Sequence, residues 1–261
     1  MNLSLEGKTA IICGSSQGIG FSIAEELAIM GANCILLARN KESLETAAQL
    51  LDSSIRQTHS TEVADFTRPD EVKKVIEKIV SATNIHVLVN NTGGPPPGAI
   101  VHAKEDEFIH AFNQHLICNH ILTRAVIPGM KKDGYGRIIN IISTSVKIPL
   151  KYLGVSNTIR AAVASWAKTF ADELGMFNIT VNNVLPGYAE TGRLKSLIKH
   201  NAAKAGIEEN KIIEQMVSEV PARRFGTASE IAAVAAFLAS PAAAYVNGTS
   251  IPVDGGRTGS I

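Results

Sequence analysis

Seven residues near the N-terminus have the composition of a phosphate-binding loop. The segment Gly14-Ser15-Ser16-Gln17-Gly18-Ile19-Gly20 directly follows a short apolar run and opens a helical pattern. Glycines let the backbone turn tightly and approach a pyrophosphate, while the start of a helix offers N–H donors and a favourable dipole. A tight turn without a ligand can have the same glycines, so the loop by itself is weak evidence. Its position between a strand and a helix favours dinucleotide binding by Gly14, Ser16, Gln17, Gly18, Ile19 and Gly20.

A second motif, at the end of the next apolar run, bears on the choice of dinucleotide. The run ends Leu37-Ala38-Arg39-Asn40, where an NAD site would place a carboxylate for the ribose 2′-hydroxyl. Ala38 cannot play that part, whereas the guanidinium of Arg39 suits a 2′-phosphate. An ordinary solvated loop arginine is the alternative. The missing acid, which would repel a phosphate, favours NADP(H) held by Arg39 and Asn40.

Short apolar runs alternate along the chain with segments of helical period. Strands are predicted at residues 9–13, 33–38, 86–90, 137–142, 179–185 and 250–253, and more weakly at 58–63. Helices are predicted at 18–30, 41–51, 69–82, 105–130, 156–174 and 229–239. This alternation indicates right-handed crossovers and a parallel sheet with both faces covered. We expect a single dinucleotide-binding and catalytic domain over residues 1–261.

The composition excludes several classes of function. The chain has 261 residues, of which 45% are hydrophobic and 19% charged, and its formal net charge is +1. Near-neutral charge gives no general attraction for nucleic acid or an anionic membrane. The longest apolar stretch, 231–246, is too short to span a bilayer, and the N-terminus lacks a signal-peptide layout. Three scattered cysteines suit a reducing compartment, so we expect a cytoplasmic protein.

Further motifs resemble those of the short-chain dehydrogenase/reductase family, and the bacterial 3-oxoacyl-carrier-protein reductases in particular. They run through nearly the whole chain and comprise the G-x-x-x-G-x-G spacing, Asp65, Asn90-Asn91-Thr92-Gly93, Ser143, Pro186-Gly187 with Thr191, Arg224-Phe225-Gly226, Asn247-Gly248 and Val253-Asp254-Gly255-Gly256. The resemblance implies a three-layer Rossmann-type, doubly wound parallel sheet of about seven strands and a homo-oligomer, often a tetramer. It also implies cofactor contacts at Asp65, Asn91, Gly93, Pro186, Gly187 and Thr191.

The chain departs from the family's pattern where the proton is handled. In the family a serine polarises the substrate oxygen, and a Tyr-x-x-x-Lys pair supplies the proton and holds the nicotinamide ribose. Ser143 keeps the first role, but the pair reads Ser156 and Arg160 here. Arg160 can bind ribose hydroxyls but cannot relay a proton, because guanidinium stays protonated. Ser156 is a far weaker acid than a phenol of pKa about 10.

Two residues, Tyr152 and His115, are candidates for the missing proton donor. Tyr152 would share a helix face with Ser156 if that helix began early, or else would be a loop residue that shields the pocket. His115 stands where the family has a relay asparagine, and a histidine with a pKa near 6.5 can shuttle protons; a structural hydrogen bond is the alternative. Tyr188, which follows Pro186-Gly187, either lines the substrate side of the pocket or packs against neighbouring side chains. No metal site is expected, since His110, His115 and His120 recur at a spacing that scatters them around a helix.

Two segments bear on the substrate. The glycine- and proline-rich segment 94–98 predicts a stiff loop beside the pocket. Residues 190–220 predict a helical lid, or merely a surface helix pair, and their first half is basic through Arg193, Lys195, Lys199 and Lys204. That charge either attracts a carboxylate-bearing substrate or is a solvated face. An acyl carrier protein is a doubtful partner, because Asp172 stands where carrier-binding reductases have an arginine.

These residues predict an NADP(H)-dependent oxidoreductase that interconverts a carbonyl or a conjugated enone with its reduced form. Conjugate reduction is attractive because solvent can protonate carbon once the enolate has formed, which removes the need for a tyrosine. The alternative is a catalytically silent NADP(H)-binding sensor or structural subunit. Loss of both members of the pair favours this alternative, whereas the retained Ser143 and the basic residue at Arg160 oppose it.

Overall fold

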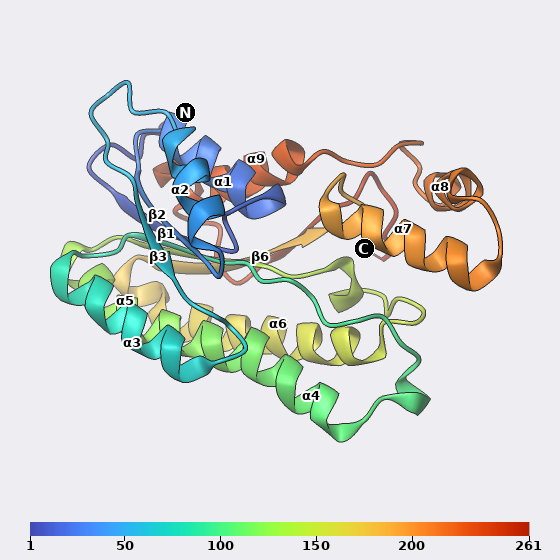
Figure 1. Ribbon diagram of the computed structural model, residues 1–261. Coiled ribbons are helices and arrows are strands. Elements are labelled where there is room, and N and C mark those ends of the chain that lie inside the picture. The colour runs from blue at the N-terminus through green and yellow to red at the C-terminus, as the bar shows by residue number, and fades with distance from the viewer. Residues whose placement is uncertain (261) are drawn as a thin grey trace.

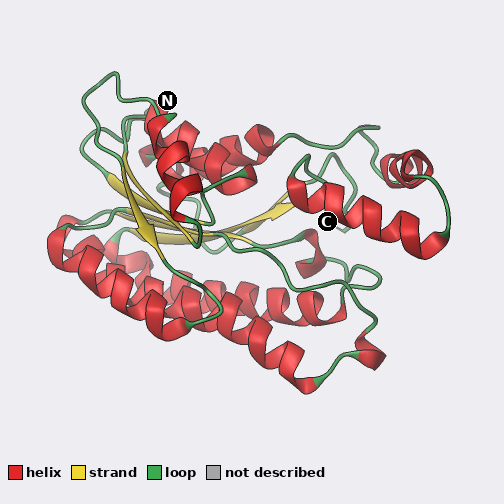
Figure 2. Ribbon diagram, in the orientation of Figure 1, coloured by secondary structure: helices red, strands yellow, loops and turns green. Residues whose placement is uncertain are grey.

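The computed structural model describes residues 1–260, which form a parallel sheet of seven strands between two layers of helices (Figures 1 and 2). The strand order is β3-β2-β1-β4-β5-β6-β7, and every neighbouring pair is parallel. The strands are β1 Thr9–Cys13, β2 Asn33–Ala38, β3 Ser60–Val63, β4 Val87–Asn90, β5 Gly136–Ile141, β6 Ile179–Pro186 and β7 Ser250–Val253. The predicted fold class is confirmed, including the weakly predicted third strand, which forms an edge of the sheet.

Helices cover both faces of the sheet and bury its strands. One face carries α1 Gly18–Ile29, α2 Lys41–Gln49 and α9 Ala228–Ala239; the other carries α3 Pro69–Ala82, α4 Glu105–Phe112, α5 Cys118–Asp133 and α6 Gly154–Leu174 (Figure 1). All residues of β1, β4 and β5 are buried. This double burial explains why the strands are continuous apolar runs rather than alternating ones.

The order of the strands locates a crevice. From β1 the chain proceeds outward to β2 and β3, and it then returns to the other side of β1 to form β4. Loops at the carboxyl ends of β1 and β4 therefore diverge, and in open α/β sheets ligands bind at such a switch point. The glycine-rich loop follows β1 and Asn91 follows β4, so the topology brings these two predicted cofactor segments together.

The long helix predicted over 105–130 is interrupted. Between α4 and α5 lies a single turn of π-helix, Asn113–Ile117, in which His115 is buried. A π turn inserts one extra residue, so it changes the face on which the following side chains lie, and such turns are frequent at functional sites.

The helix predicted over 156–174 begins two residues earlier, at Gly154. A Cβ on Gly154 would lie 2.5 Å from Cβ of Ile100. The close approach of residues 98–100 thus requires a glycine at the start of α6. Gly98 and Tyr152 share a backbone hydrogen bond of 2.7 Å at the same point.

Two helices, α7 Gly192–Ala205 and α8 Glu209–Ser218, form the segment predicted as a lid. They project beyond the edge of the sheet on the side of the carboxyl end of β6 (Figure 1). Their facing sides share a small apolar cluster of Leu194, Ile198, Ala202, Ile212 and Met216. The helices predicted in this segment are therefore present, and Leu194 and Leu197 contribute to the cavity described below.

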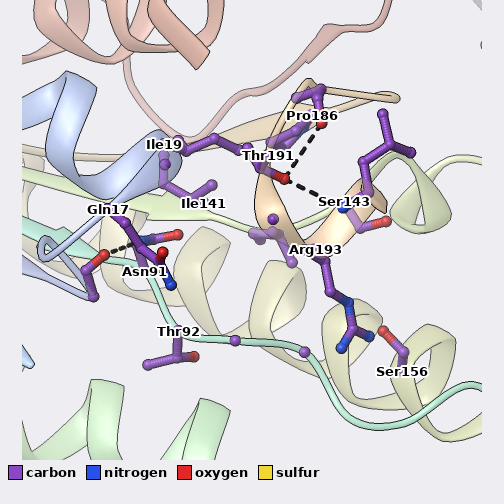
Figure 3. A pocket seen from close by; sticks show the side chains of 18 of the residues that line it. Gln17, Ile19, Asn91, Thr92, Ile141, Ser143, Ser156, Pro186, Thr191 and Arg193 are labelled. Atoms are coloured by element: carbon purple, nitrogen blue, oxygen red, sulfur yellow. Dashed lines mark hydrogen bonds between the residues drawn. The ribbon is translucent and has the colours of Figure 1, made fainter. Parts of the chain in front are cut away.

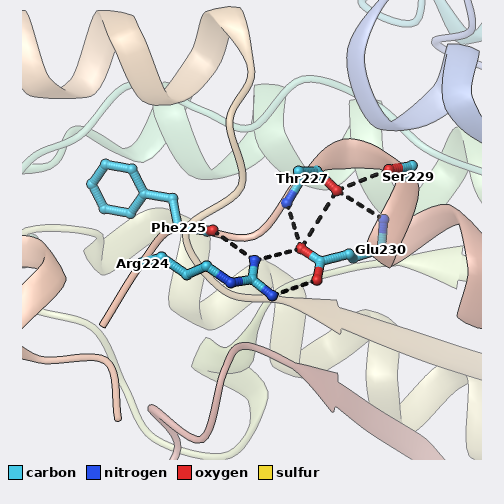
Figure 4. A network of polar contacts seen from close by, with 5 residues as sticks. All are labelled: Arg224, Phe225, Thr227, Ser229 and Glu230. Carbon is cyan, nitrogen blue, oxygen red and sulfur yellow. Dashed lines mark hydrogen bonds and ion pairs between the residues drawn. The ribbon is translucent and has the colours of Figure 1, made fainter. Parts of the chain in front are cut away.

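A surface network fixes the chain where it returns from this helix pair (Figure 4). Arg224 donates to both carboxylate oxygens of Glu230, at 2.6 and 2.7 Å, and Glu230 forms a capping box with Thr227 at the start of α9. Bonds to Arg224 and to the Thr227 N–H hold the pKa of Glu230 down at about 2. The adjacent Gly226 pairs with the loop after β6 through Tyr188 and Glu190. The network thus anchors the segment that carries part of the site.

Candidate active site

A cavity of about 630 Å³ opens at the carboxyl ends of the strands, as the switch point predicts. Loops after β1, β2, β4, β5 and β6 line it, together with the first turns of α6 and α7. Its lining includes most of the predicted cofactor and catalytic residues, namely Gly14, Ser16, Gln17, Gly18, Ile19, Arg39, Asn40, Asp65, Asn91, Gly93, Ser143, Ser156, Arg160, Pro186, Gly187 and Thr191. Three predicted residues lie outside this lining: Gly20, His115 and Tyr152.

The glycine loop is packed so that side chains would not fit. A Cβ on Gly14, whose φ is +59°, would lie 2.6 Å from the carbonyl oxygen of Asn91. One on Gly20 would collide with the carbonyl of Gly14, so Gly20 serves the close packing of the loop rather than the cavity wall. Asn91 donates to the carbonyls of Cys13 and Gly14 at 3.1 and 3.3 Å, which ties the loop to the end of β4. The N-terminus of α1 therefore faces the cavity without obstruction and can accept an anion.

Charged groups beside β2 and β3 suit the other end of a dinucleotide. Arg39 is exposed at the cavity edge, and Asn40 caps α2 by accepting from the Ser43 N–H at 2.8 Å. Although partial burial raises the pKa of Asp65, the Thr67 N–H at 2.9 Å and the positive Arg39 and Arg68 hold it below its ordinary value. Asp65 is thus ionised beside Arg39, and no carboxylate occupies the position of Ala38.

The loop after β6 forms another wall of the cavity. A Cβ on Gly187 would lie 2.6 Å from Cβ of Asp254, so only glycine fits there. Thr191 caps α7, accepting from the Leu194 N–H at 3.4 Å, and its hydroxyl donates to the carbonyl of Ala189 at 3.3 Å. The N-terminus of α7 is therefore set beside the cavity and next to that of α1, since a Cβ on Gly18 would lie 3.5 Å from Cγ2 of Thr191 (Figure 3).

Two serines and an arginine lie where β5 and α6 meet. The Oγ of Ser143 accepts from the Ser145 N–H at 3.1 Å, and Ser156 is half-buried in the first turn of α6. Arg160, one turn further along α6, is 8% exposed and donates to the carbonyls of Ile141 and Thr92 at 3.2 and 3.4 Å. Burial and the positive Arg193 lower the pKa of Arg160 to about 10. At neutral pH Arg160 is a fixed charge.

His115 lies behind the cavity wall. Its ring is 1% exposed and Nδ1 is hydrogen-bonded to Thr92 Oγ1 at 2.6 Å, while Nε2 has no partner within residues 1–260. Burial, with the charges of Arg160 and Arg193, lowers the pKa of His115 to about 2. The prediction of a histidine titrating near 6.5 is therefore wrong for this site, and His115 is neutral at working pH.

Tyr152 does not share the face of Ser156. Because α6 begins only at Gly154, Tyr152 precedes the helix with φ +60° and lies in the loop. Its side chain is 62% exposed, and Nζ of Lys204 on α7 lies 4.4 Å from its ring centroid. It borders a separate depression with Ile100 and Asn157. The condition for a direct catalytic role, an early helix start, is thus not met.

Tyr188 lines the cavity, but its hydroxyl is already engaged. It donates to Glu219 at 3.1 Å, and the guanidinium of Arg257 lies 4.1 Å from the ring centroid. Burial chiefly raises the pKa of Tyr188 to about 12. The ring packs against Phe225, so Tyr188 forms part of the cavity wall and is a weak acid.

Arg193 is the site residue that the sequence did not single out. It extends from the first turn of α7 across the cavity toward Ser156 (Figure 3), and its Nη2 donates to the carbonyl of Pro95 at 2.7 Å. The sequence offered one signal, a basic residue two positions after Thr191. It could not distinguish Arg193 from the three lysines that follow on the same helix.

The structure shows neither a metal-ligand cluster nor a membrane-spanning helix within residues 1–260. Within residues 1–260 no three His, Cys, Asp or Glu side chains gather as metal ligands would. No helix in that part of the chain is long and apolar enough to cross a membrane. Its three cysteines are buried and free.

Comparisons with known proteins agree with the fold. A family model described as enoyl-(acyl carrier protein) reductase matches residues 14–258, so the chain belongs to the short-chain dehydrogenase/reductase family. It is 34% identical over 257 residues to the 3-oxoacyl-[acyl-carrier-protein] reductase FabG of Vibrio cholerae, covering 97% of this chain and 98% of that protein. It is 31% identical over 256 residues to the NADPH-dependent reductase BacG of Bacillus subtilis, covering 97% and 99%. The structure of L-sorbose reductase from Gluconobacter frateurii, complexed with NADPH and L-sorbose, matches with a TM-score of 0.93, 31% identity and full coverage of both chains.

Proposed function

We propose that this chain is an NADP(H)-dependent oxidoreductase of the short-chain type that reduces a conjugated enone without a side-chain general acid. The cofactor of this site is NADP(H). The residues fit it: a glycine cradle meets the N-terminus of α1, Ala38 stands where an acid would exclude a 2′-phosphate, and Arg39 follows it. Bound NADPH would supply a hydride to the substrate carbon.

The observation that carries the proposal is the lack of a usable acid at the substrate end of the cavity. Tyr152 lies outside it, and the hydroxyl of Tyr188 is bonded to Glu219. His115 is neutral and separated from the cavity by Thr92. The hydroxyls of Ser143 and Ser156 remain, and both are much weaker acids than the phenol of a typical family member.

A conjugated substrate removes the need for that acid. When hydride adds to the β-carbon of an enone, the electrons move to the carbonyl oxygen and give an enolate, whose α-carbon can take its proton from water. A simple ketone would instead give an alkoxide, which needs a proton from a positioned acid. The enolate oxygen needs only stabilisation, and hydrogen-bond donors that are already oriented provide it at low reorganisation cost.

Ser143 and Arg160 can provide that stabilisation. Ser143 lies at the end of β5 with its Oγ oriented by the Ser145 N–H, which leaves the hydroxyl proton for a substrate oxygen. Arg160 is held by two backbone carbonyls and contributes a positive charge from a buried position, where charges act more strongly than in water. Its terminal nitrogens also suit the hydroxyls of the nicotinamide ribose.

The test is a screen of NADPH oxidation over matched pairs of conjugated enones and the corresponding saturated ketones. We expect turnover of enones and at least 100-fold lower kcat/KM for the saturated partners, because loss of a general acid typically costs about 10²–10⁴-fold. Reaction in D₂O should place one solvent deuterium at the α-carbon, and deuterated NADPH should label the β-carbon. Equal kcat/KM values for the saturated ketones would refute the proposal.

The same screen separates the reductase from a catalytically silent subunit. Cofactor affinity is measured in parallel by the quenching of intrinsic fluorescence or by calorimetry. Tight NADPH binding without turnover of any enone, ketone or 2-oxo acid would favour a cofactor sensor.

A further inference from the structure

The substrate end of the cavity carries positive charge without a neighbouring carboxylate. Arg160 and Arg193 both line it, and neither forms a salt bridge within residues 1–260. Arg257, by contrast, is paired with Glu219 at 2.7 Å. The acidic residue in the lining, Asp65, lies beside Arg39 on the side of β2 and β3.

The two unpaired guanidinium groups approach one point. A Cβ built on Gly94 would lie 3.5 Å from Nη2 of Arg193 and 3.6 Å from Nη2 of Arg160. Because both Nη2 atoms lie close to this one point, the two like charges repel each other, and each guanidinium has a pKa below its ordinary value, chiefly through burial. An anion placed between Gly94 and Ser156 would relieve the repulsion.

Arg193 is the more accessible of the two groups for a substrate. Arg160 is buried and each of its terminal nitrogens already donates to a backbone carbonyl, whereas the side chain of Arg193 remains accessible. The carbonyl of Pro95 holds Nη2 of Arg193, and no other hydrogen bond from this guanidinium is made within residues 1–260. Because Pro95 belongs to a proline-rich loop of restricted φ, the guanidinium is held in place before a ligand arrives.

The remaining walls define the rest of the ligand. Four leucines are among the residues that line the cavity, Leu150, Leu153, Leu194 and Leu197. We propose that Arg193 binds a carboxylate of the substrate, so that the substrate is an apolar conjugated enone that carries one carboxylate. This inference rests on the proposed reductase function. A single accessible guanidinium offers a two-donor fork that matches the two oxygens of one carboxylate.

The cofactor's own anions do not fill this subsite. Its pyrophosphate belongs at the glycine loop and the N-terminus of α1, and its 2′-phosphate beside Arg39. Figure 3 shows Gln17 of the glycine loop at one end of the cavity and Arg193 with Ser156 at the other. Arg193 is therefore free for the substrate when the cofactor is bound.

The experiment measures equilibrium binding to the NADP⁺-loaded protein, so it does not depend on turnover. Calorimetric titrations compare five- to nine-carbon conjugated enones that carry one carboxylate with the corresponding primary amides, which keep the shape and lose the charge. We expect the acids to bind about 10- to 100-fold more tightly than the amides, the range expected for a charge-assisted pair. Arg193→Gln should abolish this difference, and Arg193→Lys should retain part of it.

Two controls make the result specific. Lys199→Gln removes the same charge from an exposed position of α7 outside the cavity and should leave the difference intact. NADPH affinity of Arg193→Gln should stay within about threefold, whereas a large loss would mean that Arg193 serves the cofactor and would overturn the inference. Equal binding of acids and amides, or an unchanged difference in Arg193→Gln, would also overturn it. Acids that bind selectively but are not reduced would leave the subsite standing and refute the reductase function.

Discussion

The pH dependence of the reaction is the most direct measure of whether a side chain supplies the proton. The perturbation is pH itself, between 6.5 and 11, with kcat/KM for a conjugated enone followed at saturating NADPH. The groups around the cavity titrate outside the neutral range: the pKa of His115 is about 2, that of Arg160 about 10 and that of Tyr188 about 12. We therefore expect a flat profile from pH 6.5 to 9.

The magnitude of the expected change at high pH follows from Arg160. A charged guanidinium is present below its pKa and lost above it, so kcat/KM should fall only near pH 10 and by about tenfold for each further unit. Arg160→Lys should move that fall to lower pH, because burial depresses the pKa of a lysine from about 10.4. Circular dichroism at each pH verifies that the protein remains folded. An inflection between pH 7 and 9 that persists in Arg160→Lys would reveal another titrating acid and refute the reasoning.

Substitutions at four residues test the remaining assignments. Arg39→Ala should erode a preference for NADPH over NADH, and equal affinities in the unmodified protein would contradict the assignment of Arg39. Arg160→Ala should weaken NADPH binding, with Arg160→Lys restoring part of it; undiminished binding in the alanine variant would exclude contact with the ribose. Tyr152→Phe should change kcat by less than about twofold, since the hydroxyl lies outside the cavity. His115→Asn should reduce the fall in the free energy of unfolding at acid pH. The folded pKa of His115, about 2, lies below the unfolded value of about 6.5, so the neutral histidine contributes its full stability above pH 6.5. That stability is lost by up to about 1.4 kcal/mol per pH unit as the pH falls toward 2. Urea unfolding between pH 4 and 7 measures that difference, and parallel slopes would contradict it.

The fold could be predicted because its signals are local. Continuous apolar runs mark strands buried on both faces, and the helical segments between them leave a parallel sheet as the consistent arrangement. The edge strand β3 was the weakest prediction, because two of its four residues are exposed and its apolar pattern is correspondingly faint. The glycine positions of the predicted cofactor site follow from backbone packing, which at Gly14 and Gly187 admits only glycine.

The catalytic side of the cavity depended on contacts that periodicity does not encode. The π turn at Asn113–Ile117 leaves the apolar pattern of the helix nearly unchanged, yet it determines where His115 points. The start of α6 is set by the approach of Ile100 to Gly154, and that start decides whether Tyr152 reaches Ser156. Such tertiary contacts join segments that lie far apart in sequence.

Ser156 and Arg160, at the positions where the family resemblance implies a Tyr-x-x-x-Lys pair, suit a site organised around charge rather than proton transfer. A positive charge beside a tyrosine lowers the pKa of its phenol and so makes it a better proton donor. Here the positive charge is retained and a second guanidinium, Arg193, faces the space beside Ser156 (Figure 3). Positive potential of this kind stabilises an enolate and attracts a carboxylate, whereas it disfavours the protonated form of a cationic acid such as an imidazolium. The buried neutral His115 experiences the same potential from both arginines. Under the two proposals, a conjugated, carboxylate-bearing substrate is the one whose reduction depends least on a tyrosine acid and whose binding depends most on Arg193.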